Sequence, residues 1–140
     1  MFDSSKISTR IRDYAISHYE KLDTNNFVIG KAPFNRKCHL NSVQEVEKGK
    51  AVKVFSCFSI DKTDNSQCVH FINQLADGTY QDNTWGWLYK DSEYYLIKEI
   101  SKDEQKHIWD NLSNTKKSLV LLNSTAFERF IYRIKPTNFI

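Results

Sequence analysis

The sequence predicts an α+β fold in which N-terminal helices pack on an antiparallel sheet and the C-terminal part is helical. Three observations support this. Apolar residues recur at helical spacing near the N-terminus, segments rich in β-branched and aromatic residues fill the middle of the chain, and helix-capping patterns follow residue 100. With 140 residues, 40% of them hydrophobic, we expect residues 1–140 to form a single domain.

The N-terminal segment 4–22 predicts an amphipathic helix that Asp3, Ser4 or Ser5 can cap. Its apolar stripe recurs at steps of three and four residues and comprises Ile7, Ile11, Tyr14, Ala15, His18 and Leu22. The next segment, 23–37, carries turn formers, a glycine and a proline. We expect it to be a loop that crosses the surface.

A second helix is predicted to begin at Cys38 and to end at Gly49, a residue type that favours the position after a helix. Its expected core-facing residues are Cys38, Leu40, Val43 and Val46. Its expected water-facing residues are Gln44, Glu45 and Glu47. The helix therefore presents a cysteine at its first turn.

Strand patterns follow the second helix. Four segments are rich in β-branched and aromatic residues and are separated by polar breaks, a pattern that predicts four antiparallel strands. They cover residues 51–60, 67–75, 79–85 and 93–100. The second and third of these flank a short turn and should form a hairpin.

The C-terminal part is predicted to be helical. Ser101 and Glu104 form a capping-box pattern, which predicts a short helix over 101–112. The apolar run 119–122 is too short to assign. Ser124 can cap a last helix. The buried stripe expected for that helix is Phe127, Phe130, Ile131 and Ile134.

The hairpin turn decides whether His70 and Asp82 can cooperate, because side chains alternate between the two faces of a strand. A two-residue turn sends them to opposite faces. A three-residue loop that ends in a left-handed Gly78 pairs Leu75 with Thr79 and brings both to one face. The sequence permits this pair without enforcing it. The alternative is a half-buried strand histidine and a solvent-facing acid.

Cys38 is the candidate nucleophile. A thiol at a helix N-terminus experiences the positive end of the helix dipole, and Arg36 and Lys37 add positive charge. Both effects favour the thiolate, which a nearby imidazole would stabilise further. The alternative is a buried structural cysteine, an interpretation that fits Cys57 better.

A cysteine at a helix start, followed by a histidine and an aspartate on adjacent strands, resembles the papain-like and transglutaminase-like cysteine superfamily. His70, and Asp82 followed by Asn-Thr-Trp-Gly, resemble the transglutaminase-like core. The motif Cys38-His39-Leu40-Asn41 resembles the Cys-His-x-Asn helix start of small phage- or prophage-type papain-like proteins. The resemblance covers about residues 35–88.

This resemblance implies a papain-like or transglutaminase-like fold and a cysteine-dependent acyl transfer. The enzyme would be a peptidase, an amidase or deamidase, or a transglutaminase-like protein, and its target a protein or peptide. Cys38 would be the nucleophile, His70 the general base and acid, and Asp82 the residue that orients the imidazole.

Further site residues are expected around this triad. The oxyanion hole would use the backbone N–H of Cys38 and a side-chain amide from either Asn35 or Asn26. Trp85 and Trp87 are candidates for a substrate groove, with burial in the core as their alternative role.

A non-catalytic role is the alternative function. His39 stands where the family usually has an aromatic residue, and Ile72 where it usually has a tryptophan. These departures leave room for a phage-type binding protein or inhibitor of a host or defence factor on the same scaffold.

Composition limits the remaining classes. The net charge of +3 comes from scattered basic residues, so a nucleic-acid partner is not expected. No apolar run approaches the roughly 20 residues that cross a bilayer, so no membrane partner is expected. Three cysteines, an odd number, without a signal-peptide core suggest free thiols in a cytoplasm, that of the host if the protein is phage-encoded.

A metal site is a further alternative. Cys68 and His70 share a strand face, and Cys38 and His39 add two possible ligands. The spacings Cys-x-x-Cys and His-x-x-x-His do not occur. We therefore expect neither a metal nor a cofactor.

Overall fold

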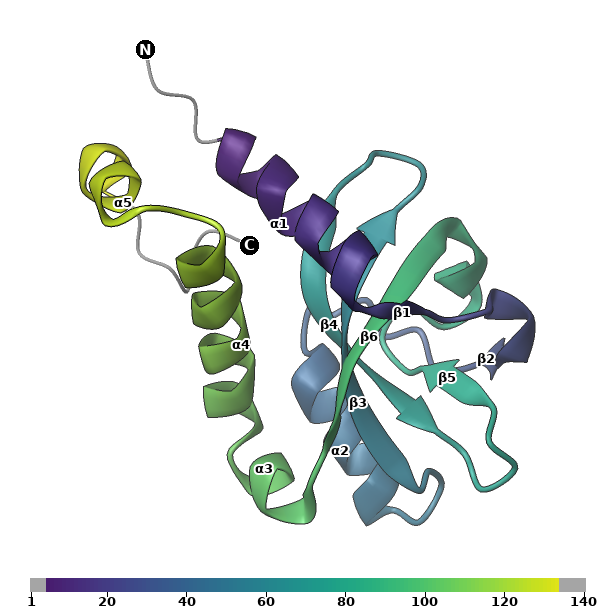
Figure 1. The fold of residues 1–140 in the computed structure, drawn as a ribbon. Helices are drawn as coiled ribbons and strands as arrows, with labels where there is room; N and C mark the ends of the chain where they lie inside the picture. Colours follow the sequence, from purple (N-terminus) through teal and green to yellow (C-terminus); the bar gives the residue numbers. More distant parts are fainter. Residues whose placement is uncertain (1–4, 134–140) are drawn as a thin grey trace.

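The computed structural model describes residues 5–133 and has an α+β fold, as predicted, built on a curled six-stranded sheet (Figure 1). The strands lie in the order β1-β6-β3-β4-β5-β2. Their bounds are β1 Glu20–Lys21, β2 Phe27–Ile29, β3 Lys53–Asp61, β4 Gln67–Gln74, β5 Tyr80–Asp82 and β6 Ser92–Ile100. The helices are α1 Ser5–His18, α2 Cys38–Glu47, α3 Lys102–Lys106, α4 Ile108–Leu122 and α5 Ala126–Tyr132, with 3-10 turns η1 Thr24–Asn26 and η2 Gly86–Asp91.

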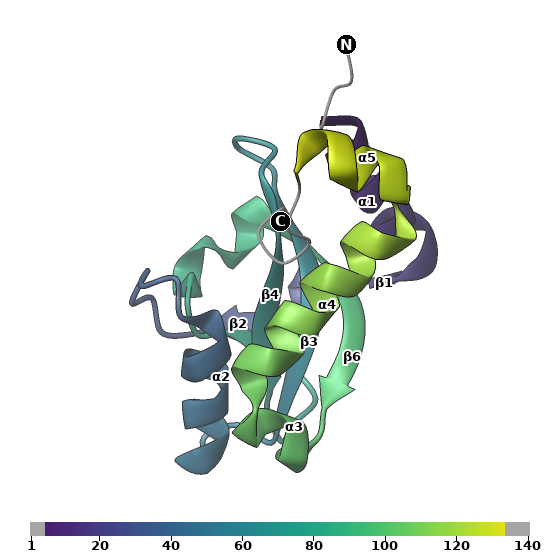
Figure 2. The same cartoon turned by 90° about the vertical axis from the view of Figure 1, so that its left-hand side faces the viewer.

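The main core lies between the sheet and the helices α1, α2 and α4, which cover one face (Figures 1 and 2). Ile7 and Ile11 of α1 are fully buried and belong to the same core cluster as Val54 and Phe58 of β3. Each such aliphatic side chain contributes about 1.5–3 kcal/mol when buried. The helical spacing predicted for the start of α1 is therefore confirmed.

A second core fills the opposite face of the curled sheet. It is mostly aromatic and contains Leu22, Phe27, Phe55, Cys57, Ile72, Tyr89 and Tyr94. These residues come from β3, β4 and β6 and from the segments that wrap over them, η2 and the chain between α1 and α2. This face also carries the side chain of His70, because His70 and Ile72 alternate with Val69 and Phe71 of the main core.

The four predicted strands are present, and the pairs β3–β4, β3–β6 and β4–β5 are antiparallel as expected. Two strands were not predicted. Residues 20–21, assigned to the first helix, form the edge strand β1 against β6, because Leu22 is drawn into the aromatic core. Residues 27–29, assigned to a loop, form β2 parallel to β5. Val28 and Ile29 are exposed, so they give no alternating pattern.

The predicted inward face of α2 is right for Cys38, Val43 and Val46, which pack against the main core, and wrong for Leu40 and Glu45. His39, Ser42 and Glu45 are buried, whereas Leu40 is 42% exposed. Polar contacts bury this side of the helix: the backbone carbonyl of Ser42 accepts a hydrogen bond from the buried Asn73 amide, and Glu45 pairs with Lys31. Val43 and Val46 are partly buried against the main core, as expected.

The C-terminal helices also differ from the prediction. The segment 101–112 is divided at His107 between α3 and α4, and 119–122 is the last turn of α4. The capping box of Ser101 and Glu104 is confirmed.

The predicted cap and buried stripe of the last helix are wrong. Thr125, and not Ser124, caps α5 because its hydroxyl accepts from the N–H of Glu128, while the Ser124 hydroxyl bonds back to α4. The stripe residues Phe127, Phe130 and Ile131 are exposed. Ile134 lies outside the described residues.

Candidate active site

The hairpin register brings the predicted histidine and aspartate together. The N–H of Leu75 donates to the carbonyl of Thr79 over 2.8 Å, and Gly78 has φ +87°. This is the three-residue loop, which only a residue tolerant of positive φ closes without strain. The paired positions of β4 and β5 continue this register. It places His70 and Asp82 on the same face, and the predicted register is confirmed.

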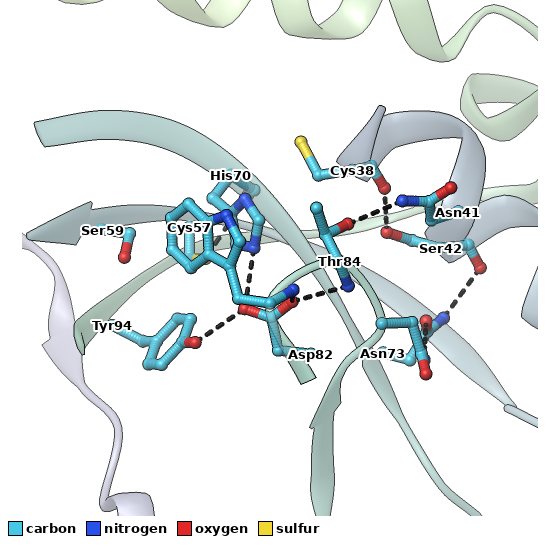
Figure 3. A network of polar contacts seen from close by, with 12 residues as sticks. Cys38, Asn41, Ser42, Cys57, Ser59, His70, Asn73, Asp82, Thr84 and Tyr94 are labelled. Atoms are coloured by element: carbon cyan, nitrogen blue, oxygen red, sulfur yellow. Dashed lines mark hydrogen bonds and ion pairs between the residues drawn. The ribbon is translucent and has the colours of Figure 1, made fainter. Parts of the chain in front are cut away.

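Asp82 is fully buried, and both oxygens of its carboxylate accept hydrogen bonds. His70 Nε2 lies 2.9 Å from Oδ2, and the hydroxyl of Tyr94 donates to the same oxygen over 2.7 Å (Figure 3). Oδ1 accepts the backbone N–H groups of Thr84 and Trp85, each at 2.9 Å. Four donors therefore fix the carboxylate and, through it, the imidazole.

Trp85 covers the imidazole. Its ring stacks on His70 with centroids 3.9 Å apart and an angle of 8° between the planes. His70 is only 2% exposed, so the His–Asp pair is shielded from water. Trp87 is instead 59% exposed and contacts Phe34 edge to face at 6.2 Å. Of the two groove candidates, Trp87 is exposed and Trp85 is partly buried.

Cys38 is the first residue of α2, as predicted, and it lies beside the edge of β4. The N–H of Leu75 points toward β5, and N–H groups of alternate residues along a strand point the same way. The N–H of Phe71 therefore points to this edge, but its partner in the register would be Asn83, beyond the end of β5. It instead helps to lower the pKa of the Cys38 thiol.

The charges of the site favour the Cys38 thiolate. Burial raises the pKa of this thiol, but the charge of His70 and hydrogen bonds from His39, His70 and the Phe71 N–H outweigh it and lower the pKa to about 6. Burial opposes the charged form of His70, yet Asp82 and Cys38 raise its pKa well above the ordinary value. A thiolate–imidazolium pair is thus the favoured state near neutral pH.

The other two cysteines differ from Cys38. Burial raises the pKa of the Cys57 thiol well above its ordinary value. Burial also raises the pKa of the Cys68 thiol. Both are therefore internal references for the reactivity of Cys38.

The two oxyanion candidates lie in different places. Asn35 stands before α2, where its Oδ1 accepts from the N–H of Lys37 at 3.1 Å and from Asn41 at 2.9 Å. Asn26 precedes β2, whose Phe27 pairs with Tyr80. It is therefore level with the hairpin turn, roughly 10 Å along the strand from the end of β5. The structure does not bring Asn26 to Cys38.

Three residues of the site had no predicted role in it. Tyr94 binds Asp82 across the sheet, but in the sequence it is one of several strand aromatics. Asn41 donates to Thr84 over 2.9 Å and joins α2 to the segment after β5 (Figure 3). Asn41 is the asparagine of the Cys-His-x-Asn motif, so the motif already pointed to this residue. His39 is buried against Trp109, and its Nδ1 has no hydrogen-bond partner among residues 5–133.

Gly86 lets the segment after Trp85 pack closely on the chain before α2. It has φ +50°, and an added Cβ would lie 2.7 Å from the Cβ of Ala32 and 2.8 Å from the carbonyl oxygen of Gly30. Gly49 has φ +73° with nothing within 4 Å of such a Cβ.

Alanine at Gly86 or at Gly49 incurs backbone strain of about 1 kcal/mol. We expect Gly86→Ala to lose a further 1–3 kcal/mol or so from overpacking, measured by urea unfolding. Equal losses in the two variants would contradict this account.

No group of three or more His, Cys, Asp or Glu side chains within the described part of the chain could hold a metal ion. The helices between residues 5 and 133 are all too short or too polar to cross a membrane.

Comparison of the chain with protein-family models, curated proteins and solved structures finds no match. The chemistry of the site therefore rests on the contacts of Cys38, His70 and Asp82 themselves.

Proposed function

We propose that this protein is a cysteine-dependent acyl-transfer enzyme with a triad of Cys38, His70 and Asp82 on a papain-like or transglutaminase-like core. One observation carries the proposal. A thiol at the start of α2 has its pKa lowered by the charge of an imidazole whose Nε2 is held by a buried carboxylate with four donors. Such a chain of nucleophile, base and orienting acid is the arrangement that acyl transfer requires.

The reaction begins with attack of the Cys38 thiolate on a carbonyl carbon. A C–S bond forms and the carbonyl electron pair moves to oxygen, close to the N-terminus of α2, where Lys37 makes no side-chain cap. His70 Nδ1, the nitrogen that does not face Asp82, then gives its proton to the leaving amine as the C–N bond breaks. A thioester remains on Cys38. His70 next takes a proton from water or an acceptor amine, whose attack releases the acyl group and restores the thiolate.

Exposed aromatic residues beside the triad support a protein or peptide substrate. Phe34 is 48% exposed and Trp87 59%, and they contact one another. The N–H of Phe34 donates to the carbonyl of Thr84 at 3.1 Å. Phe34 also has φ +49°, a conformation that costs a residue with a side chain about 1–2 kcal/mol. Backbone strain that holds an aromatic side chain in water, four residues before the nucleophile, favours substrate contact.

The proposed compartment follows from the chemistry of the thiol. A cysteine with a pKa of about 6 is mostly thiolate at neutral pH and is readily oxidised. A reducing compartment such as a cytoplasm would keep it active.

The pH dependence of Cys38 alkylation tests the proposal. The rate of iodoacetamide labelling, followed by mass spectrometry of the Cys38 peptide, should rise with a midpoint near pH 6, because only the thiolate reacts. Cys57 and Cys68 should label far more slowly in the same samples. An activated ester such as p-nitrophenyl acetate should release a burst of nitrophenolate and leave the acetyl group on Cys38.

The alternative function, a binding protein without catalysis, gives the opposite result. Its Cys38 would titrate like an ordinary thiol, with a midpoint near pH 8.5, and would show no acylation burst. That outcome would contradict the enzyme proposal.

A further inference from the structure

We propose that a cavity beside α2 is a subsite that binds a carboxylate of the substrate, one helical turn from the nucleophile. The inference rests on the proposed acyl-transfer function and names a feature of its substrate. The cavity has a volume of about 320 Å³. One wall is formed by Asn41, Gln44 and Glu45 of α2 with Lys48 at the C-cap of that helix, and the opposite wall includes Lys31 and Asn83.

The cavity begins at the same face of α2 as the nucleophile. Cys38, Asn41, Glu45 and Lys48 follow one another at steps of three, four and three residues, which form one stripe along a helix. Asn41 is about 4.5 Å along the helix axis from Cys38. Its side chain lines the cavity and donates to Thr84 within the site (Figure 3). A substrate that reacts at Cys38 can therefore reach the cavity with an adjacent group.

The charges around the cavity favour an anion. Lys31 Nζ lies 2.6 Å from Oε1 of Glu45, whose side chain is only 6% exposed. Lys48 also lines the cavity, so its walls carry two ammonium groups and one carboxylate. The exposed Gln44 amide supplies a neutral donor at the rim. A carboxylate would balance this excess of positive charge and accept these donors.

The wall opposite α2 is already fixed. Asn83 is buried, and its Nδ2 donates to Asn73 at 2.9 Å and to Gln81 at 3.1 Å. Its Oδ1 accepts the N–H of Lys31 at 3.1 Å. The cavity is thus held open by hydrogen bonds within the protein, and binding would require little reordering of this wall.

Chloroacetyl derivatives of glutamic acid α-amide, glutamine α-amide and leucine α-amide are the probes, since each places a different side chain near the alkylated Cys38. We expect the glutamate probe to react about tenfold faster than the glutamine and leucine probes at low ionic strength, with a loss of this preference in high salt. The thiolate itself repels an anionic reagent, so such a preference must arise from another group. Chloroacetyl-leucine with a free α-carboxylate is the fourth probe. Its rate shows whether the cavity binds the carboxylate of a chain terminus or that of an acidic side chain.

Lys48→Gln should reduce the preference to about twofold or less. Lys6→Gln removes the same charge on α1, outside the cavity, and should leave the preference unchanged. Both lysines are exposed, so both variants should fold. Equal rates for the glutamate and glutamine probes, or an equal effect of the two substitutions, would overturn the subsite alone. An ordinary pH midpoint of Cys38 would instead overturn the acyl-transfer proposal.

Discussion

Replacing His70 with glutamine is expected to move the pH midpoint of Cys38 alkylation from about 6 into the ordinary thiol range, near 8.5. The imidazole charge is the largest favourable influence on the thiolate, and it is lost in this variant. At pH 6.5 the thiolate fraction, and with it the labelling rate, should fall roughly 100-fold. The acylation burst with p-nitrophenyl acetate should disappear at the same pH, because the general acid–base group is absent.

Glutamine keeps a side-chain amide that can donate to Asp82, so the variant retains a partner for the buried carboxylate. His18→Gln on the exposed end of α1 is the matched control and should leave the midpoint near pH 6. Circular dichroism and thiolate absorbance in the ultraviolet would separate unfolding from a changed pKa. A folded His70→Gln protein with an unchanged midpoint would show that the imidazole does not activate Cys38.

The features predicted from sequence are those that local chemistry decides. A glycine tolerant of positive φ closes the three-residue hairpin loop, and that loop alone sets the faces of His70 and Asp82. The polar stretch before Cys38 and the helical pattern after it likewise locate the start of α2. The β-branched and aromatic content of β3, β4 and β6 reflects two buried faces.

The features that could not be predicted depend on partners far along the chain. The helical pattern of α2 predicts that Glu45 faces water, but its pairing with Lys31 and the packing of α2 against β4 bury it. β1 and β2 are two and three residues long and exist because β6 and β5 offer unpaired edges. The role of Tyr94 needs the curl of the sheet, which brings β6 within reach of the carboxylate after β5.

The early end of β5 connects the fold with the site. At Asp82 the chain turns, since its carboxylate binds the N–H groups of the two residues that follow Asn83. The turn stops the β4–β5 ladder and leaves the N–H of Phe71 without a strand partner. That edge is where the sulfur of Cys38 lies. One aspartate therefore orients the histidine and also ends the strand that would otherwise cover the thiol's position.

Asp82→Asn is accordingly expected to reduce both stability and thiol activation. The amide leaves His70 without its countercharge, so the His70 pKa should fall and the Cys38 midpoint should rise above pH 6. Loss of one partner from a buried ion pair costs about 3–5 kcal/mol, which urea unfolding at pH 7 would measure.

Tyr94→Phe removes only one donor from the same oxygen of Asp82. It should cost about 1.5–3 kcal/mol in the same unfolding measurement, with a smaller rise of the Cys38 midpoint.

The stability difference between wild type and Asp82→Asn should also depend on pH. Burial opposes ionisation of Asp82, but His70, the Trp85 N–H and Tyr94 hold the pKa of the carboxyl below its ordinary value. The stabilisation is therefore complete above the unfolded-state pKa, about 3.9, and is lost as pH falls through the lower native pKa. Unfolding curves from pH 7 to below pH 4 should show the two proteins converging in acid. A difference that stays constant to the lowest pH would indicate that shape or hydrogen bonding, and not the charge of Asp82, stabilises the native site.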